Sequence, residues 1–307
     1  MSLKLNDKKG MIFALLGFSF FSIGDVFIKF LADDEFTAVE IAFFLNLFYL
    51  PFLIILSPVI GGIKATLRTE NLWLHVLRAL LGVVVFIINI TAFKILGLSI
   101  TYALIFAAPF FATIISHFFM PDTVHKHRWI AVLMGFVGIL IVLRPGVESF
   151  HPIAYLALLS ALIIAITNIL ARKIGEHEPL MAFSLFHTII GLQVFGVLNF
   201  WDGQANLPQT NDWLYFFAIA VCHMIGMLMT SRAFSITDTS FVAPFHYVQL
   251  LWGTGFGILI FSNVPDIWTG LGAMIIVFSG IYMIYRERIR NQHITTGVTT
   301  HGTIDKD

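Results

Sequence analysis

The sequence is poor in charge. Only 12% of its 307 residues are Asp, Glu, Lys or Arg, against about 25% in an average soluble protein. Hydrophobic residues make up 58% of the chain, which contains 32 Phe and has a mean hydropathy of +0.88. A soluble fold of this length cannot bury that much apolar surface. The composition therefore excludes a soluble globular protein and predicts an integral membrane protein.

The sequence also lacks a net charge and has almost no cysteine. Its 18 basic residues balance 18 acidic residues, which excludes nucleic-acid binding through bulk charge. The single Cys222 excludes an internal disulfide. We expect no cofactor and no bound metal, because no residue pattern points to either.

Ten segments are apolar enough to cross a bilayer, which takes about 17–25 residues each. They are predicted at 9–31, 36–60, 71–94, 97–119, 128–144, 152–173, 180–201, 212–235, 239–262 and 267–285. The connections between them are short, so any function resides within the helix bundle. The sequence therefore predicts an all-α integral membrane fold with ten transmembrane helices, followed by a polar cytoplasmic tail at 287–307.

The basic residues predict the orientation of the chain in the membrane, because they concentrate in cytoplasmic loops. With the N-terminus inside, alternate loops place most of them on the cytoplasmic side. Those inside include Lys8, Lys9, Lys64, Arg68, Lys126, Arg128, Arg172, Lys173, Arg286, Arg288 and Arg290, and those outside are Lys29, Lys94 and Arg144. We therefore expect both termini in the cytoplasm.

The two halves of the sequence resemble each other. The segment "ALLGFSFFSIGDVFIKFLADDE" lies over "ALLSALIIAITNILARKIGEHE", so that Asp25 meets Asn168. Two further pairs of segments align in the same order and at nearly the same offset. Because each half holds an odd number of helices, the halves must insert in opposite orientations. We predict two inverted five-helix repeats, 9–144 and 152–286, an arrangement typical of alternating-access transporters.

Long segments of the chain resemble a known family. They are "WLHVLRALLGVVVFIINITAFKILGLSITYALIFAAPFFATIISHFF" and "APFHYVQLLWGTGFGILIFSNVPDIWTGLGAMIIVFSGIYMIYRE". Each resembles part of one half of the EamA-type carriers in the drug/metabolite transporter superfamily. The resemblance implies a lipid-embedded carrier of a bacterial inner membrane that moves a small molecule through a central cavity without ATP. Monomer and homodimer both stay open.

Within this superfamily, three segments resemble the bacterial carriers that take up S-adenosylmethionine. They are "DVFIKF", "VEIAFF" and "AFSITDTSFVAPFHYVQL". The chain departs from the family pattern at Leu45 and Asn46 in the second predicted helix and at Asn263 after the ninth. Riboflavin, an amino acid or a drug-like compound therefore stays open as an alternative substrate.

Asp25 and Lys29 lie in the first apolar segment, where an ionisable group is costly and normally faces protein or water. Two hypotheses are open for Asp25. In the first, the two side chains, four residues apart on one helix, pair with each other and anchor the helix end. In the second, Asp25 lines the substrate cavity. The polar Asn168 at the repeat-related position slightly favours the second hypothesis.

Other polar residues in the apolar segments are candidates for substrate binding. Asn89 is either a substrate contact or an interhelical hydrogen-bonding residue. The ninth predicted helix has the most polar interior, and its aromatic and amide side chains suit a planar ring. The predicted substrate-binding residues are Asp25, Asn89, Tyr102, Asn168, His246, Tyr247, Gln249 and Trp252.

The remaining polar residues have other interpretations. Arg78, near the cytoplasmic surface, is interpreted as a lipid or interfacial anchor, and His187 and His223 as interhelical hydrogen-bonding residues. The loop segment "DTVHKH", with Asp122, His125 and His127, raises the alternative of a membrane-embedded enzyme. No second acidic cluster accompanies this segment, so the sequence favours a secondary transporter.

Overall fold

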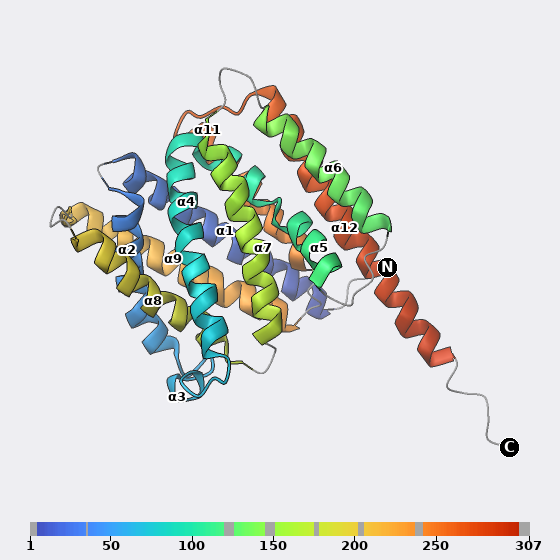
Figure 1. The fold of residues 1–307 in the computed structure, drawn as a ribbon, viewed down its shortest axis with the longest axis horizontal. Helices are drawn as coiled ribbons and strands as arrows, with labels where there is room; N and C mark the ends of the chain where they lie inside the picture. Colours follow the sequence, from blue (N-terminus) through green and yellow to red (C-terminus); the bar gives the residue numbers. More distant parts are fainter. Residues whose placement is uncertain are drawn as a thin grey trace.

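A computed structural model describes residues 5–34, 36–119, 126–144, 151–174, 178–201, 206–236 and 242–300. Every regular element in these ranges is a helix, and together they form a bundle (Figure 1). The first half contains α1 (Leu5–Asp33), α2 (Ala38–Leu56), α3 (Ile63–Thr66), α4 (Leu72–Ile105), α5 (Ala108–Phe119) and α6 (Lys126–Leu143). The second half contains α7 (Ile153–Ile174), α8 (Leu180–Phe200), α9 (Thr210–Ile236), η1 (Ala243–Tyr247), α11 (Val248–Leu259) and α12 (Ile267–Thr300).

The helices agree with the ten predicted spans. Six helical stretches of the described chain are long and apolar enough to cross a membrane. One of them, Leu72–Ile115, is 44 residues long and covers the third and fourth predicted spans. Trp129–Leu143 and Ile267–Met283 are shorter apolar helices, and η1 with α11 corresponds to the ninth span. The prediction of an all-α membrane protein is confirmed.

The third and fourth spans are joined at a single residue. Gly97 has φ 79° and ψ 170° within an otherwise helical α4, a conformation that side chains strongly disfavour and glycine tolerates. The fourth span is interrupted again by a turn at Phe106 and Ala107, just before Pro109 of α5. Proline cannot donate a backbone hydrogen bond. The helix is therefore interrupted just before a residue that cannot continue its hydrogen-bonding pattern.

Helices of the first half pack mainly against helices of the second. The most extensive contacts pair α1 with α9, α6 with α12, α4 with α7 and α2 with α8. The core between them is rich in apolar and aromatic side chains, with Phe44, Tyr102, Phe110 and Phe216 among its buried members. Polar residues are a minority of the buried side chains, and the polar residues that line a cavity are the candidates for the site.

The pair α6 and α12 lies at one edge of the bundle, side by side (Figure 1). Arg144 at the end of α6 is 2.5 Å from Asp266 before the start of α12. Asp266 also accepts a hydrogen bond of 2.9 Å from the Thr269 backbone amide in the first turn of α12. Hydrogen bonds from Thr269, with the Arg144 charge, hold the Asp266 pKa below its ordinary value. The two helices are thus joined at their loop end.

Helix ends differ from the predicted borders at two places. Thr37 and Glu40 form a capping box at the start of α2, and Glu40 also accepts a hydrogen bond of 2.7 Å from the Asn206 amide. Charged and polar residues satisfy the free amides at this helix end. At the other end of the chain, helix α12 continues to Thr300, so most of the predicted polar tail at 287–307 is helical. The change from apolar to polar residues after 285 therefore marks the end of the predicted membrane span but not the end of helix α12.

Candidate functional site

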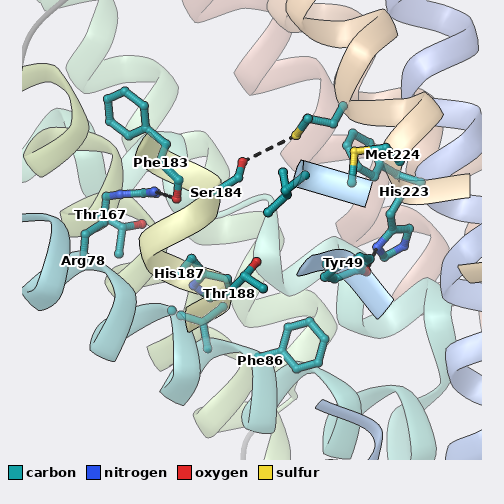
Figure 2. Close-up of a pocket in the computed structure, with 15 residues that line it drawn as sticks. Tyr49, Arg78, Phe86, Thr167, Phe183, Ser184, His187, Thr188, His223 and Met224 are labelled. Carbon is teal, nitrogen blue, oxygen red and sulfur yellow. Dashed lines mark hydrogen bonds between the residues drawn. The ribbon is translucent and has the colours of Figure 1, made fainter. Parts of the chain in front are cut away.

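Two cavities lie between the helices, and they meet at two residues. The larger has a volume of about 430 Å³ and is lined by residues of α1, α2, α4, α7, α8 and α9 (Figure 2). The smaller, of about 150 Å³, is lined by α1, α4, α9, η1, α11 and the turn at Phe106. Phe86 and His223 line both. The cavities are therefore neighbours, with Phe86 and His223 in the wall of each.

Asp25 lies at the smaller cavity and is held by a neighbouring helix. The Tyr102 hydroxyl on α4 donates to its Oδ2 at 2.5 Å. Its Oδ1 lies 3.4 Å from Nε2 of His223 on α9, and both side chains are largely buried, with 13% of Asp25 and 17% of His223 exposed. Three helices thus contribute to the surroundings of this carboxylate, the only acidic side chain among the described residues that line the two cavities.

The predicted pairing of Asp25 with Lys29 is not formed. The Lys29 ammonium instead contacts Asp33 at 2.9 Å, one turn further along α1. It also donates to the Phe93 carbonyl oxygen at 3.1 Å and lies 4.9 Å from the centre of the Phe261 ring. Within the described chain no Lys or Arg pairs with Asp25, which lines the smaller cavity. The pairing hypothesis is therefore wrong, and the role of this cavity in substrate binding stays a prediction.

His223 joins Asp25 to a fourth helix. Its Nδ1 lies 2.7 Å from the Tyr49 hydroxyl of α2. When Tyr49 donates this hydrogen bond, the imidazole proton resides on Nε2, the nitrogen that faces Asp25. The result is a chain of polar groups from Tyr49 through His223 and Asp25 to Tyr102. The interpretation of His223 as an interhelical residue is correct but incomplete, because its ring also lines both cavities.

Asn89, His246 and Gln249 surround the smaller cavity with Asp25 and Tyr102, as the sequence predicted for a common site. The Asn89 amide oxygen also accepts a hydrogen bond of 2.7 Å from Ser160 of α7, so Asn89 is an interhelical hydrogen-bonding residue, and its contact with a substrate stays a prediction. The His246 ring stacks on Phe18, with 4.6 Å between ring centres. This cavity combines one carboxylate with amides and aromatic faces.

Three predicted residues line neither cavity. Trp252 of α11 donates to Ser19 of α1 at 2.7 Å and stacks on Phe256. The Tyr247 ring is buried against Phe106 and α12. Asn168 is exposed on α7, although the preceding Thr167 lines the larger cavity. A helix turns by about 100° per residue, so neighbours in sequence face different surroundings.

Arg78 lines the larger cavity, contrary to its interpretation as a lipid anchor. It points toward α8, where its Nη2 donates to the Phe183 carbonyl oxygen (Figure 2). His187 and Thr188 of α8 line the same space. The substrate-binding residues predicted from the sequence lie on α1, α4, α7, η1 and α11. The prediction missed that α2 and α8 also contribute to the cavity walls. A basic residue one turn inside an apolar helix was the available signal.

The residues behind the enzyme hypothesis lie largely outside the described chain. Asp122 and His125 belong to the undescribed range 120–125. Elsewhere, no group of three or more His, Cys, Asp or Glu side chains is close enough to hold a metal ion in the part of the chain that the structure describes. The candidate site is therefore the interior space between the helices.

The sequence matches the model of the EamA-like transporter family over two stretches, residues 8–144 and 151–286. These stretches include every residue that lines the two cavities. The chain belongs to the EamA-like transporter family. It is thus a membrane transporter of small molecules, and the enzyme alternative fails because this family and the curated relatives are transporters.

Two curated relatives of this transporter have different named substrates. An "S-adenosylmethionine uptake transporter" of Rickettsia bellii is 28% identical over 274 residues, covering 87% of this chain and 90% of the relative. A "Riboflavin transporter" of Vibrio cholerae is 29% identical over 227 residues, covering 74% and 76%. A solved crystal structure aligns with a TM-score of 0.63 at 14% identity, covering 93% of this chain and 99% of that one. This last similarity concerns the fold alone.

Removing the Tyr49 hydroxyl tests the polar chain in this transporter. In Tyr49→Phe, His223 loses its partner on α2 and no longer holds a fixed tautomer toward Asp25. A hydrogen bond of this kind contributes about 0.5–1.5 kcal/mol, so we expect transport to fall roughly 2- to 10-fold in vesicles. Tyr215→Phe is the matched control, because the Tyr215 hydroxyl has no hydrogen bond within the described residues. An equal effect of both variants would contradict the role of Tyr49.

Proposed function

We propose that this transporter is a secondary carrier that takes up S-adenosylmethionine by alternating access. The observation that carries the proposal is the chemistry of the smaller cavity. There the Asp25 carboxylate lies among the rings of Phe86, Phe93, Tyr102, Phe106 and His246. A carboxylate with aromatic faces suits an organic cation, and the sulfonium of S-adenosylmethionine is one. Its adenine is a planar ring that can stack on the same surfaces.

The size of the interior space is consistent with this substrate. A nucleoside sulfonium is larger than the smaller cavity and must extend past Phe86 and His223 into the larger one. The larger cavity is lined by hydroxyl groups as well as apolar side chains, among them Thr167, Ser184 and Thr188. Riboflavin is also planar, but it is uncharged and makes no use of the Asp25 charge.

Alternating access requires two halves that move relative to each other, and we propose that these are inverted repeats, 9–144 and 152–286. The helix contacts support this division. If α1 corresponds to α7 and α4 to α9, then the contact of α1 with α9 corresponds to the contact of α7 with α4. The contacts of α2 with α8 and of α6 with α12 each join corresponding helices. Such a pattern is expected of two-fold pseudosymmetry.

The same proposal includes the setting of the chain. We place it in a bacterial inner membrane with both termini in the cytoplasm, following the basic residues of the loops. In this orientation α1 runs outward, Asp25 lies toward the outer side and Arg78 toward the inner side. Cysteine accessibility at positions in the loops on each side tests this orientation directly.

Uptake of labelled S-adenosylmethionine into proteoliposomes tests the proposed substrate. We expect saturable uptake that unlabelled S-adenosylmethionine blocks and that riboflavin and amino acids do not. Block by riboflavin, with weak competition by S-adenosylmethionine, would contradict the proposed substrate and favour riboflavin instead. No uptake by protein shown to be folded and inserted would overturn the substrate while leaving the family assignment intact.

A further inference from the structure

Arg78 is a half-buried cation that lines the larger cavity, and within the described chain it has no carboxylate partner. Its guanidinium carbon lies 5.0 Å from the centre of the Phe183 ring, and its Nη2 donates to the Phe183 carbonyl oxygen. Its Nε is buried and has no hydrogen-bond partner among the described residues. A guanidinium has five N–H donors, so Arg78 can donate further hydrogen bonds to a ligand in this cavity.

The nearby acidic residue on the same side of the bundle is occupied. Glu178 accepts hydrogen bonds from Thr69 and Asn71 and lies 3.9 Å from Nε2 of His75, one turn before Arg78 on α4. Within the described chain, no carboxylate lies within 4.0 Å of the Arg78 guanidinium. Arg78 is half-buried, so its charge is partly removed from water without a carboxylate beside it, a cost that the anionic group of a ligand would offset.

We propose that Arg78 binds the carboxylate of the transported metabolite, so that the substrate carries a carboxylate on the Arg78 side and a cationic group, the sulfonium of S-adenosylmethionine, on the Asp25 side. This inference rests on the proposed function and extends it. Asp25 and Arg78 are the only acidic residue and the only Lys or Arg among the described residues that line the two cavities, and they lie in different cavities. The two cavities meet at Phe86 and His223. A substrate with these two groups therefore meets a partner of opposite charge for each of them, Arg78 for the carboxylate and Asp25 for the cationic group.

The surroundings of Arg78 favour a carboxylate over a phosphate. A phosphate group carries more charge than one guanidinium neutralises, and a second cation is missing from the described cavity lining. A carboxylate matches one guanidinium in charge and in its two-oxygen geometry. Ser184 and His187 line the same cavity. The Ser184 hydroxyl donates a hydrogen bond of 3.5 Å to Met227 Sδ. This hydroxyl and the His187 imidazole can also donate to a bound carboxylate.

Decarboxylated S-adenosylmethionine tests this proposal, because it keeps the adenine and the sulfonium and lacks only the carboxylate. Each compound competes with labelled S-adenosylmethionine for uptake into proteoliposomes. In the unaltered protein we expect the complete substrate to compete about 10- to 100-fold better, the range expected for hydrogen bonds to a charged group. In Arg78→Gln the ratio of the two affinities should approach one, because only the binding of S-adenosylmethionine becomes weaker. Arg78→Lys should have an intermediate ratio.

Arg68→Gln is the matched control, because it removes the same charge from an exposed loop on the same side of the bundle. It should leave the ratio unchanged. Equal weakening of both compounds by Arg78→Gln would overturn the proposal and assign Arg78 a structural role. An effect that appears only in vesicles with anionic phosphatidylglycerol, and not in pure phosphatidylcholine, would also overturn it in favour of lipid binding.

A second readout separates this inference from the proposed substrate. If the unaltered protein binds neither sulfonium compound, S-adenosylmethionine fails as the substrate, and the thermal stability of the protein is measured with methionine and with 3-(methylthio)propylamine. Stabilisation by the amino acid alone, lost in Arg78→Gln and kept in Arg68→Gln, would support the carboxylate site. Absence of any difference between these two probes would overturn it.

Discussion

Asp25→Asn is expected to reduce uptake of a cationic substrate by about 10- to 100-fold. Asparagine has nearly the same shape and can still accept the hydrogen bond from Tyr102. What disappears is the negative charge, which Lys29 does not neutralise because it contacts Asp33. The measurement is initial uptake into proteoliposomes at matched protein density.

Asp34→Asn provides the control, because Asp34 lies at the exposed end of the same helix and lines neither cavity. It should transport normally. Thermal melting in detergent separates a transport defect from a folding defect, and both variants should melt close to the unaltered protein. Undiminished uptake by Asp25→Asn would exclude Asp25 from substrate binding and with it the main support for a cationic substrate.

Gly272→Ala is expected to lower the stability of the bundle by about 1–3 kcal/mol, as overpacking of a close contact does. A Cβ at this position would lie 2.6 Å from the Gly138 carbonyl oxygen and 3.0 Å from the Val142 backbone nitrogen. Backbone atoms cannot move aside as a flexible side chain can. The helices α6 and α12 must therefore separate, and the melting temperature in detergent should fall by several degrees.

Gly270→Ala is a stringent control, since it adds the same methyl group two residues earlier on the same helix. Nothing lies within 4 Å of the Cβ that this change would add. In open space, alanine favours a helix over glycine by about 1 kcal/mol, so this variant should melt at the same or a slightly higher temperature. Equal melting of the two variants would show that α6 and α12 do not approach as closely as described.

The candidate site shows which of its residues could be predicted from the sequence. Asp25, Asn89 and Tyr102 were predicted from their polarity inside apolar segments, and they gather at one cavity as expected. Trp252 has the same kind of pattern but hydrogen-bonds to Ser19 outside both cavities. Polarity within a span predicts that a residue faces protein. It does not predict which of several helices that residue will meet.

Arg78 illustrates the opposite error. In the sequence it is one more basic residue near the cytoplasmic end of a span, a position where most such residues contact lipid headgroups. Its place in a cavity depends on α8, which contributes Phe183 and lies more than a hundred residues further along the chain. Contacts between residues so distant in sequence depend on how the helices pack.

By itself, the sequence determined that this protein crosses a membrane and that it is helical, because apolar length is a property of consecutive residues. The tertiary structure decided the partners of the charged residues. Lys29 contacts Asp33, Asp25 contacts Tyr102 and His223, and no carboxylate of the described chain pairs with Arg78. These pairings arise where helices from both halves meet, since a buried charge is stabilised or left unpaired only by what the fold places beside it.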